Sequence, residues 1–153
     1  MPMASLPQGG EDEVFAPPPS TLDPLKGQGR AFAAVALGGV LGALTRYGIG
    51  LLLPHRPGML PLGTLLINVL GGLLIGALIV TVAERGRGHP LARPFLGTGV
   101  LGGFTTFSTY TVDAQQLVAA GRTAVAGAYL AGTLVAALVA TWVGLTVTRK
   151  VLR

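Results

Sequence analysis

The chain contains no cysteine, and charged side chains make up only 11% of its 153 residues. A soluble domain carries roughly 25% charged residues. The shortage is greatest between Ala31 and Thr148, where eight residues are charged, too few to keep a water-soluble fold of that length from precipitating. The lack of cysteine excludes a disulfide framework and thiolate chemistry. The scarcity of charge argues against a soluble enzyme and against a nucleic-acid binder.

The first 30 residues differ in composition from the rest of the chain. They contain four of the six acidic residues and six of the eleven prolines. A segment so poor in core-forming side chains is expected to be a disordered N-terminal tail. It does not have the pattern of a secretory signal, because an acidic cluster precedes any apolar run. We expect residues 31–153 to form the membrane domain.

Beyond residue 30, charged residues divide the chain into four long apolar runs. A helix needs about 20 apolar residues to cross the roughly 30 Å hydrocarbon layer of a bilayer, and each run is long enough. Proline and glycine fall between the runs, as is typical of loops. A bundle of soluble helices is the alternative, and it fails because no polar surface remains to cover it. The pattern predicts an all-α membrane protein with four transmembrane helices, at about 31–53, 60–83, 94–118 and 123–148.

Basic residues are unequally shared between the two sides that four crossings create. The side opposite the termini carries Arg56 and Arg122. Because cytoplasmic loops are enriched in Lys and Arg, we expect both termini in the cytoplasm. The eight basic residues on that side are Lys26, Arg30, Arg85, Arg87, Arg93, Arg149, Lys150 and Arg153.

Glycine is abundant, and 20 of the 24 glycines lie within residues 31–148. In lipid, small residues spaced four apart let helix backbones approach closely. We interpret these residues as helix-packing positions. Because four helices make a small bundle for enclosing a pathway, a transport function would call for an oligomer. The spaced pairs include Gly38/Gly42, Gly39/Ala43 and Gly72/Gly76.

The third apolar run has an unfavourable composition for a helix. Its sequence GTGVLGGFTTFSTYTV places four glycines before a block of hydroxyl and β-branched residues, which are weak helix formers. We expect the helix to break near Gly102–Thr106. A break inside a membrane frees backbone carbonyls that protein, water or an ion must satisfy. Such carbonyls suit a monovalent cation such as Na⁺.

Several polar and aromatic side chains lie inside the predicted spans. Asn68 is near the middle of the second span, where its amide either bonds to another helix or donates to an anion. Phe107 and Tyr110 are three residues apart on one helical face. Their rings either pack against neighbours or offer their positive edges to an anion.

The fourth span carries a partly hydroxylated face, with Tyr129, Thr133 and Thr141 in register and Ala137 between them. Threonine in a membrane helix usually bonds to its own backbone, so this face only weakly indicates a polar path. No Asp, Glu, Lys or His interrupts any of the four apolar runs, and Asp113 comes only at the end of the third, although proton-coupled transport normally needs an embedded titratable residue. The chain also lacks a nucleophile–base pair and a nucleotide-binding loop. These features favour passive passage of a small anion and argue against an enzyme.

Three blocks, GGVLGALTRYGIG (38–50), PLGTLLINVLGG (61–72) and GTGVLGGFTTFSTYTVDA (97–114), closely resemble the Fluc/CrcB fluoride channel family. The resemblance covers roughly residues 31–148 and implies an antiparallel dimer with two fluoride pores. It also implies a structural Na⁺ at the dimer centre, held by the carbonyls of Gly102 and Thr105. Arg46 matches an arginine of the family whose role is left open. The implied pore residues are Asn68, Phe107, Ser108, Thr109, Tyr110 (where the family usually has Phe), Tyr129 and Thr133.

The resemblance implies a fluoride-selective channel that exports F⁻ passively across the bacterial plasma membrane and lowers its toxicity. A negative-inside potential drives anions outward by about 2.3 kcal/mol per charge per 100 mV. One alternative is a small dual-topology multidrug exporter, which would need an embedded Glu; another is a non-conducting membrane assembly subunit. An antiparallel homodimer needs a chain that inserts in both orientations, which calls for a nearly balanced distribution of basic residues. Here the basic residues are divided eight to two between the two sides. The dimer partner is therefore either a second copy or an oppositely oriented homologous subunit.

Overall fold

The computed structural model describes residues 28–84 and 89–153, so most of the predicted tail lies outside the described residues. Within these ranges the chain is helical and contains no strand. The first helix begins at Gly29, two residues before the predicted start of the membrane domain. The elements are α1 (Gly29–Leu52), α2 (Leu62–Leu78) with its π-helical continuation η1 (Ile79–Glu84), η2 (Arg93–Leu101), α3 (Gly102–Phe104), α4 (Ser108–Ala119) and α5 (Thr123–Val151).

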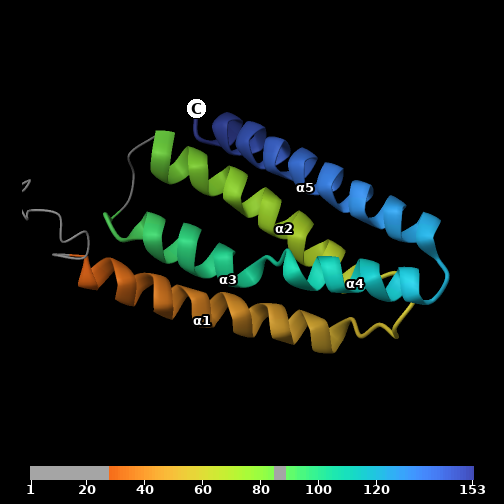
Figure 1. The fold of residues 1–153 in the computed structure, drawn as a ribbon. Helices are drawn as coiled ribbons and strands as arrows, with labels where there is room; N and C mark the ends of the chain where they lie inside the picture. Colours follow the sequence, from red (N-terminus) through yellow and green to blue (C-terminus); the bar gives the residue numbers. More distant parts are fainter. Residues whose placement is uncertain (1–27, 85–88) are drawn as a thin grey trace, which may run out of the picture.

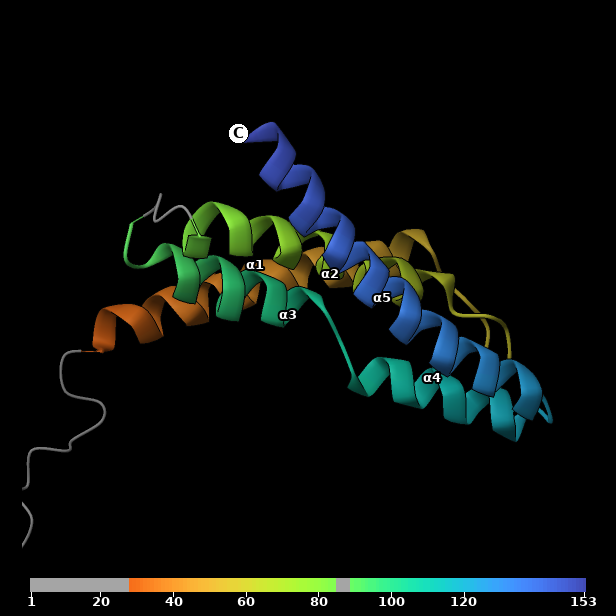
Figure 2. The same ribbon diagram turned by 90° about the horizontal axis from the view of Figure 1, so that it is seen from above.

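The helices run back and forth between two ends of the molecule (Figure 1). The start of α1 and the end of α5 lie at one end, and the short connections after α1 and α4 lie at the other. In this view η2, α3 and α4 follow one line between α1 and α2. Figure 2 shows that α4 diverges from α3 and lies beside the first half of α5, which crosses the other helices obliquely.

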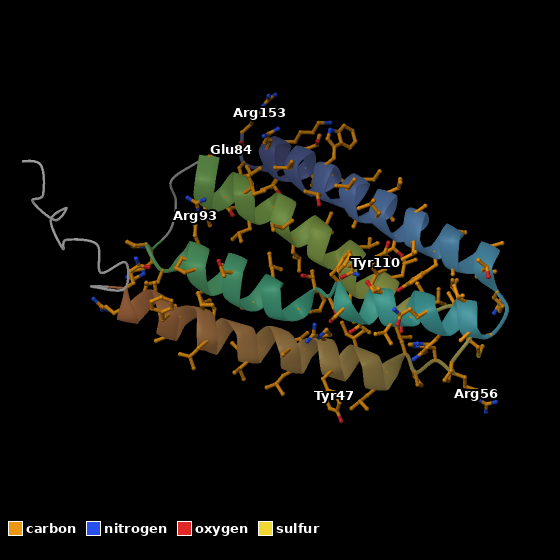
Figure 3. The ribbon with its side chains drawn as sticks, in the orientation of Figure 1. Tyr47, Arg56, Glu84, Arg93, Tyr110 and Arg153 are labelled. Carbon is orange, nitrogen blue, oxygen red and sulfur yellow. The ribbon has the colours of Figure 1, made fainter. Side chains whose placement is uncertain are left out.

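Three of these helical segments are long and apolar enough to cross a membrane: Gly29–Leu52, Leu62–Val82 and Thr123–Val151. The predicted third span is divided instead into η2 with α3 on one side of a break and α4 on the other. The outer surface is apolar, with Leu37, Leu44 and Trp142 each more than half exposed, and Tyr47 points away from the bundle in Figure 3. So large an apolar surface is suited to lipid.

Glycines bring the helix backbones into close contact at two interfaces. A Cβ atom on Gly42 of α1 would lie 2.7 Å from the backbone nitrogen of Phe104. A Cβ atom on Gly76 of α2 would lie 2.9 Å from the backbone nitrogen of Leu145 in α5 and would overlap the Thr141 carbonyl. The helix-packing role predicted for Gly38, Gly42, Gly72 and Gly76 is confirmed, whereas a Cβ atom on Gly39 would meet no atom within 4 Å. The same close packing is found at Gly99, Gly103 and Gly144.

The substitution Gly76→Ala is expected to destabilise the protein by about 1–3 kcal/mol, because overpacking forces a backbone to shift. The added Cβ would meet the backbone of α5, which cannot rotate away as a flexible side chain can. Thermal unfolding of the purified protein in detergent measures the effect. Gly127→Ala is the matched control, since a Cβ there meets no atom within 4 Å and Ala is the better helix former. Equal losses in the two variants would contradict the close packing.

Candidate functional site

The site is centred on the break between α3 and α4. Helical structure stops after Phe104, Thr105 has extended backbone (φ −75°, ψ 162°), and α4 starts at Ser108. The break therefore lies close to the predicted Gly102–Thr106, although Gly102 itself is still helical. The Thr106 hydroxyl accepts a hydrogen bond from the Thr109 N–H at 3.1 Å. It thereby satisfies one of the free N–H groups in the first turn of α4.

Two side chains from neighbouring helices bind the backbone of the break. Asn68 of α2 donates from Nδ2 to the Thr106 carbonyl at 3.0 Å and accepts from the Thr106 N–H at 3.0 Å. Arg46 of α1 donates to the Thr105 carbonyl at 3.1 Å. Because backbone groups freed inside a membrane need partners, these bonds stabilise the extended residues. Arg46 thus has a structural role. Asn68 makes a bond between helices, which is one of the two roles that its position in the sequence suggested. An amide nitrogen carries two N–H groups, and the bond to Thr106 uses one of them.

An open groove of about 460 Å³ runs along the break. Asn68, Phe107, Tyr110 and Thr133 all line it, so the structure brings together four of the seven predicted pore residues. Gly102 and Thr105, the predicted sodium ligands, line the same groove. None of the described residues lining the groove is charged; the others are Gly71, Gly72, Ile75, Gly97, Leu101, Thr106, Leu134 and Ala137.

Three aromatic rings lead from the groove into the protein. Phe107 is 79% exposed, and its ring centroid lies 5.8 Å from that of Tyr110. The Tyr110 ring in turn lies 5.4 Å from that of Tyr129, which is buried. Both pairs are tilted, by 52° and 50°, an arrangement that directs ring edges toward neighbouring groups. Figure 3 shows Tyr110 in the middle of the molecule.

The substitution Tyr110→Phe is expected to leave transport within about twofold and to cost about 0.5–1.5 kcal/mol of stability, the net worth of one hydrogen bond. The Tyr110 hydroxyl donates to the Leu130 carbonyl at 2.6 Å, so it is already bound to α5. Liposome flux and thermal unfolding of the same preparation check both halves of this expectation. A large change of flux would mean that the hydroxyl also serves the transported ion.

Thr133 differs from the other hydroxyl residues of the site. It is 3% exposed, and its Oγ1 has no hydrogen-bond partner among the described residues. Thr141, which lies two turns further along the same face of α5, bonds instead to the Ala137 carbonyl of its own helix. A buried hydroxyl without a partner costs free energy. Thr133 therefore offers the groove a donor that the protein itself does not use.

Ser108 and Thr109 are exposed at the start of α4 and lie near the Thr106 hydroxyl, at 3.3 Å and 3.1 Å between oxygens. Thr109 faces a second cavity, of about 370 Å³, at the end of the molecule where α1 joins α2. Of the residues that line this cavity, only Thr106 also lines the groove. Besides Thr106 and Thr109, its polar lining residues are Arg46, His55 and Thr64.

Sequence reasoning missed a polar cluster beside this second cavity. Asp113 of α4 is 4% exposed, and one of its carboxylate oxygens accepts from the Thr64 hydroxyl at 2.6 Å and the Tyr129 hydroxyl at 3.4 Å. The other carboxylate oxygen lies 3.3 Å from His55 Nε2. In the sequence, Asp113 directly follows the third apolar run, and its position alone does not mark it as part of a site. The signal that could have identified it is its rarity, since Glu84 is the one other acid between residues 31 and 148.

Together, a helix broken at mid-length, an uncharged groove beside the break and an apolar outer surface define a membrane protein of the channel and transporter class. Comparison with known proteins identifies the family. The family model described as "CrcB-like protein, Camphor Resistance (CrcB)" matches residues 33–145. The chain therefore belongs to the CrcB family, and it is a multi-pass membrane protein of a channel family, not an enzyme.

Two relatives illustrate the similarity. "Fluoride-specific ion channel FluC 1" of Streptomyces coelicolor is 48% identical over 126 residues, which is 82% of this chain and 82% of the relative. "Fluoride-specific ion channel FluC" of Paracoccus denitrificans is 46% identical over 118 residues, or 77% of this chain and 94% of the relative. Both alignments cover most of each protein.

Proposed function

We propose that this chain forms a fluoride-selective channel that exports F⁻ passively across the bacterial plasma membrane and so lowers its toxicity in the cytoplasm. The names of its relatives support fluoride as the ion. The observation that carries the proposal is the composition of the groove, which offers amide, hydroxyl and ring-edge donors and no charged side chain among its described lining residues.

Fluoride is small and strongly hydrated, so a pathway must replace its water. The second Asn68 N–H, the unpartnered Thr133 hydroxyl and the exposed Phe107 ring edge are available for this. Conduction also requires that each site release the ion. Donors without a fixed positive charge bind an anion weakly enough for release, which favours a channel over a tight binding site.

The open side of the groove supports the proposed antiparallel dimer. A single chain leaves the Phe107 ring 79% exposed and its pathway uncovered along one face. We propose that η2 with α3 and α4 together make the fourth crossing, and that a partner closes the groove. This partner is a second copy or an oppositely oriented homologous subunit.

The free backbone carbonyls at the break between α3 and α4 support the proposed structural Na⁺. Thr106 N–H, which would continue the helix to the Gly102 carbonyl, bonds to Asn68 instead, and the Thr105 carbonyl has left the helix. Carbonyl oxygens are suitable donors for a hard cation. One Thr105 lone pair is used by Arg46, so two carbonyls from one chain leave the ion incompletely coordinated. A partner would supply the remaining oxygens at the dimer centre, where the ion would hold the two breaks together.

The proposed orientation has both termini in the cytoplasm. In Figure 3, Arg153 and Arg93 lie at one end of the molecule and Arg56 at the other. The bias of basic residues toward the first end supports this orientation.

Fluoride efflux from liposomes containing the purified protein tests the proposal. Fluoride is expected to leave rapidly without a proton gradient, whereas chloride stays inside. Replacing external and internal Na⁺ by a large organic cation is expected to lower fluoride efflux, because the dimer loses its central ion. Proton-dependent efflux of an organic cation would favour the multidrug exporter. Absence of efflux of both fluoride and the organic cation would favour the assembly subunit.

A further inference from the structure

The polar cluster around Asp113 lies at the end of the molecule where α1 joins α2. The carboxylate is buried against Thr64 and Tyr129, whereas the side chain of His55 is 26% exposed and borders the cavity of about 370 Å³. His55 therefore contacts a buried acid on one side and the cavity on the other. This cavity shares Thr106 with the groove and Arg46 with the break. It therefore adjoins the groove at Thr106, and we take it as the mouth through which an ion would leave the groove.

An ionised carboxylate beside this route would repel an anion strongly, because Asp113 is out of water. Thr64 and Tyr129 donate hydrogen bonds to it but carry no compensating charge. The imidazole of His55 is the one titratable cation in direct contact with the carboxylate among the described residues. Histidine changes its charge between about pH 5 and pH 8.

Resting on the proposed fluoride conduction, we propose that His55 is a pH-responsive positioning residue at the channel mouth. Its protonation neutralises Asp113 and raises fluoride conductance, and its deprotonation leaves the Asp113 carboxylate without a cation in contact with it, which lowers conductance. The protonated pair has no net charge, so it does not trap the anion. Acidic surroundings, which drive fluoride into cells as neutral HF, would thus increase export.

The other charged and titratable groups around the cluster do not change charge in this range. Arg46 from α1 keeps its charge at any working pH. Arg122, in the turn before α5, is bonded to the Gly58 carbonyl at 2.8 Å. Arg56 follows His55 and extends outward at the end of the molecule (Figure 3). The groups that face the His55–Asp113 pair are Arg46 from α1, Thr64 from α2 and Tyr129 from α5.

Fluoride current through the full-length protein in planar bilayers tests the proposal, because HF carries no current. Wild-type current is expected to rise about threefold or more between about pH 7.5 and about pH 5.5, as the local potential at the mouth changes. His55→Gln is expected to hold the current at the lower level at both pH values. Asp113→Asn is expected to hold it at the higher level at both.

His89→Gln is the matched control, since His89 is the second of two histidines and its Nδ1 accepts a hydrogen bond from the backbone N–H of Leu91 at 3.2 Å. This variant is expected to keep the wild-type response. A wild-type current that does not change with pH, or an unchanged response in His55→Gln, would overturn the role of His55 and leave the channel proposal standing. If His55→Gln does not assemble, an unchanged response in Asp113→Asn overturns it equally. Absence of fluoride current at every pH would overturn the proposed function itself.

Discussion

Asn68→Asp is expected to lower fluoride flux by about a hundredfold or more, the largest loss that we expect from one atom's replacement. The change removes both Nδ2 donors of a side chain that lines the groove, and one of them holds the Thr106 carbonyl. A hydrogen bond to a charged group is worth about 1.5–3 kcal/mol, and about 1.4 kcal/mol corresponds to a factor of ten in rate. The new carboxylate adds direct repulsion of the anion. Fluoride efflux from liposomes measures the loss.

The Asn68→Asp variant keeps one of the two side-chain bonds to the break. The aspartate can still accept from the Thr106 N–H, as the Asn68 oxygen does at 3.0 Å, so α2 and the break remain partly connected. Thr146→Val serves as the control, because the Thr146 hydroxyl is exposed and bonds to its own helix at the Trp142 carbonyl. Its flux is expected to equal that of the wild type. Normal fluoride flux in Asn68→Asp would exclude Asn68 from the pathway.

The helical architecture was largely predictable because it depends on local properties of the chain. Apolar runs of membrane length predicted the long helices, and α1 begins only two residues from the expected position. Adjacent glycines and β-branched residues also predicted the break, which occurs at Thr105. The spacing of small residues identified Gly42 and Gly76 as contact points. Each inference used residues within a few positions of one another.

The contacts that organise the site could not be predicted in the same way, because they join distant segments. Asn68 and Thr106 are 38 residues apart, and Arg46 and Thr105 are 59 apart. Periodicity places a residue on a helical face but does not say which neighbour that face meets. The pairing of His55 with Asp113 was missed for this reason. The pore roles assigned to all seven residues, Ser108 and Thr109 included, stay predictions that flux measurements must test.

Thr133→Val separates a role in conduction from a role in stability. Valine has nearly the shape of threonine, and it removes a buried hydroxyl that has no partner among the described residues. Removing an unsatisfied buried group is expected to leave stability unchanged or to raise it by about 1 kcal/mol. If that hydroxyl donates to fluoride in passage, the flux is expected to fall about tenfold, the equivalent of one charge-assisted hydrogen bond. Flux and thermal unfolding of the same preparation measure the two effects.

Thr141→Val is the matched control for this variant. Thr141 lies on the same face of α5, but its hydroxyl bonds to the Ala137 carbonyl at 2.9 Å, so its loss is expected to leave flux unchanged. A purely structural Thr133 would show the reverse pattern, with lower stability and normal flux. An equal loss of flux in both variants would mean that valine disturbs the packing of α5 against α2. Only a loss confined to Thr133→Val, without loss of stability, fits a hydroxyl that serves the ion, because no described residue accepts a hydrogen bond from it.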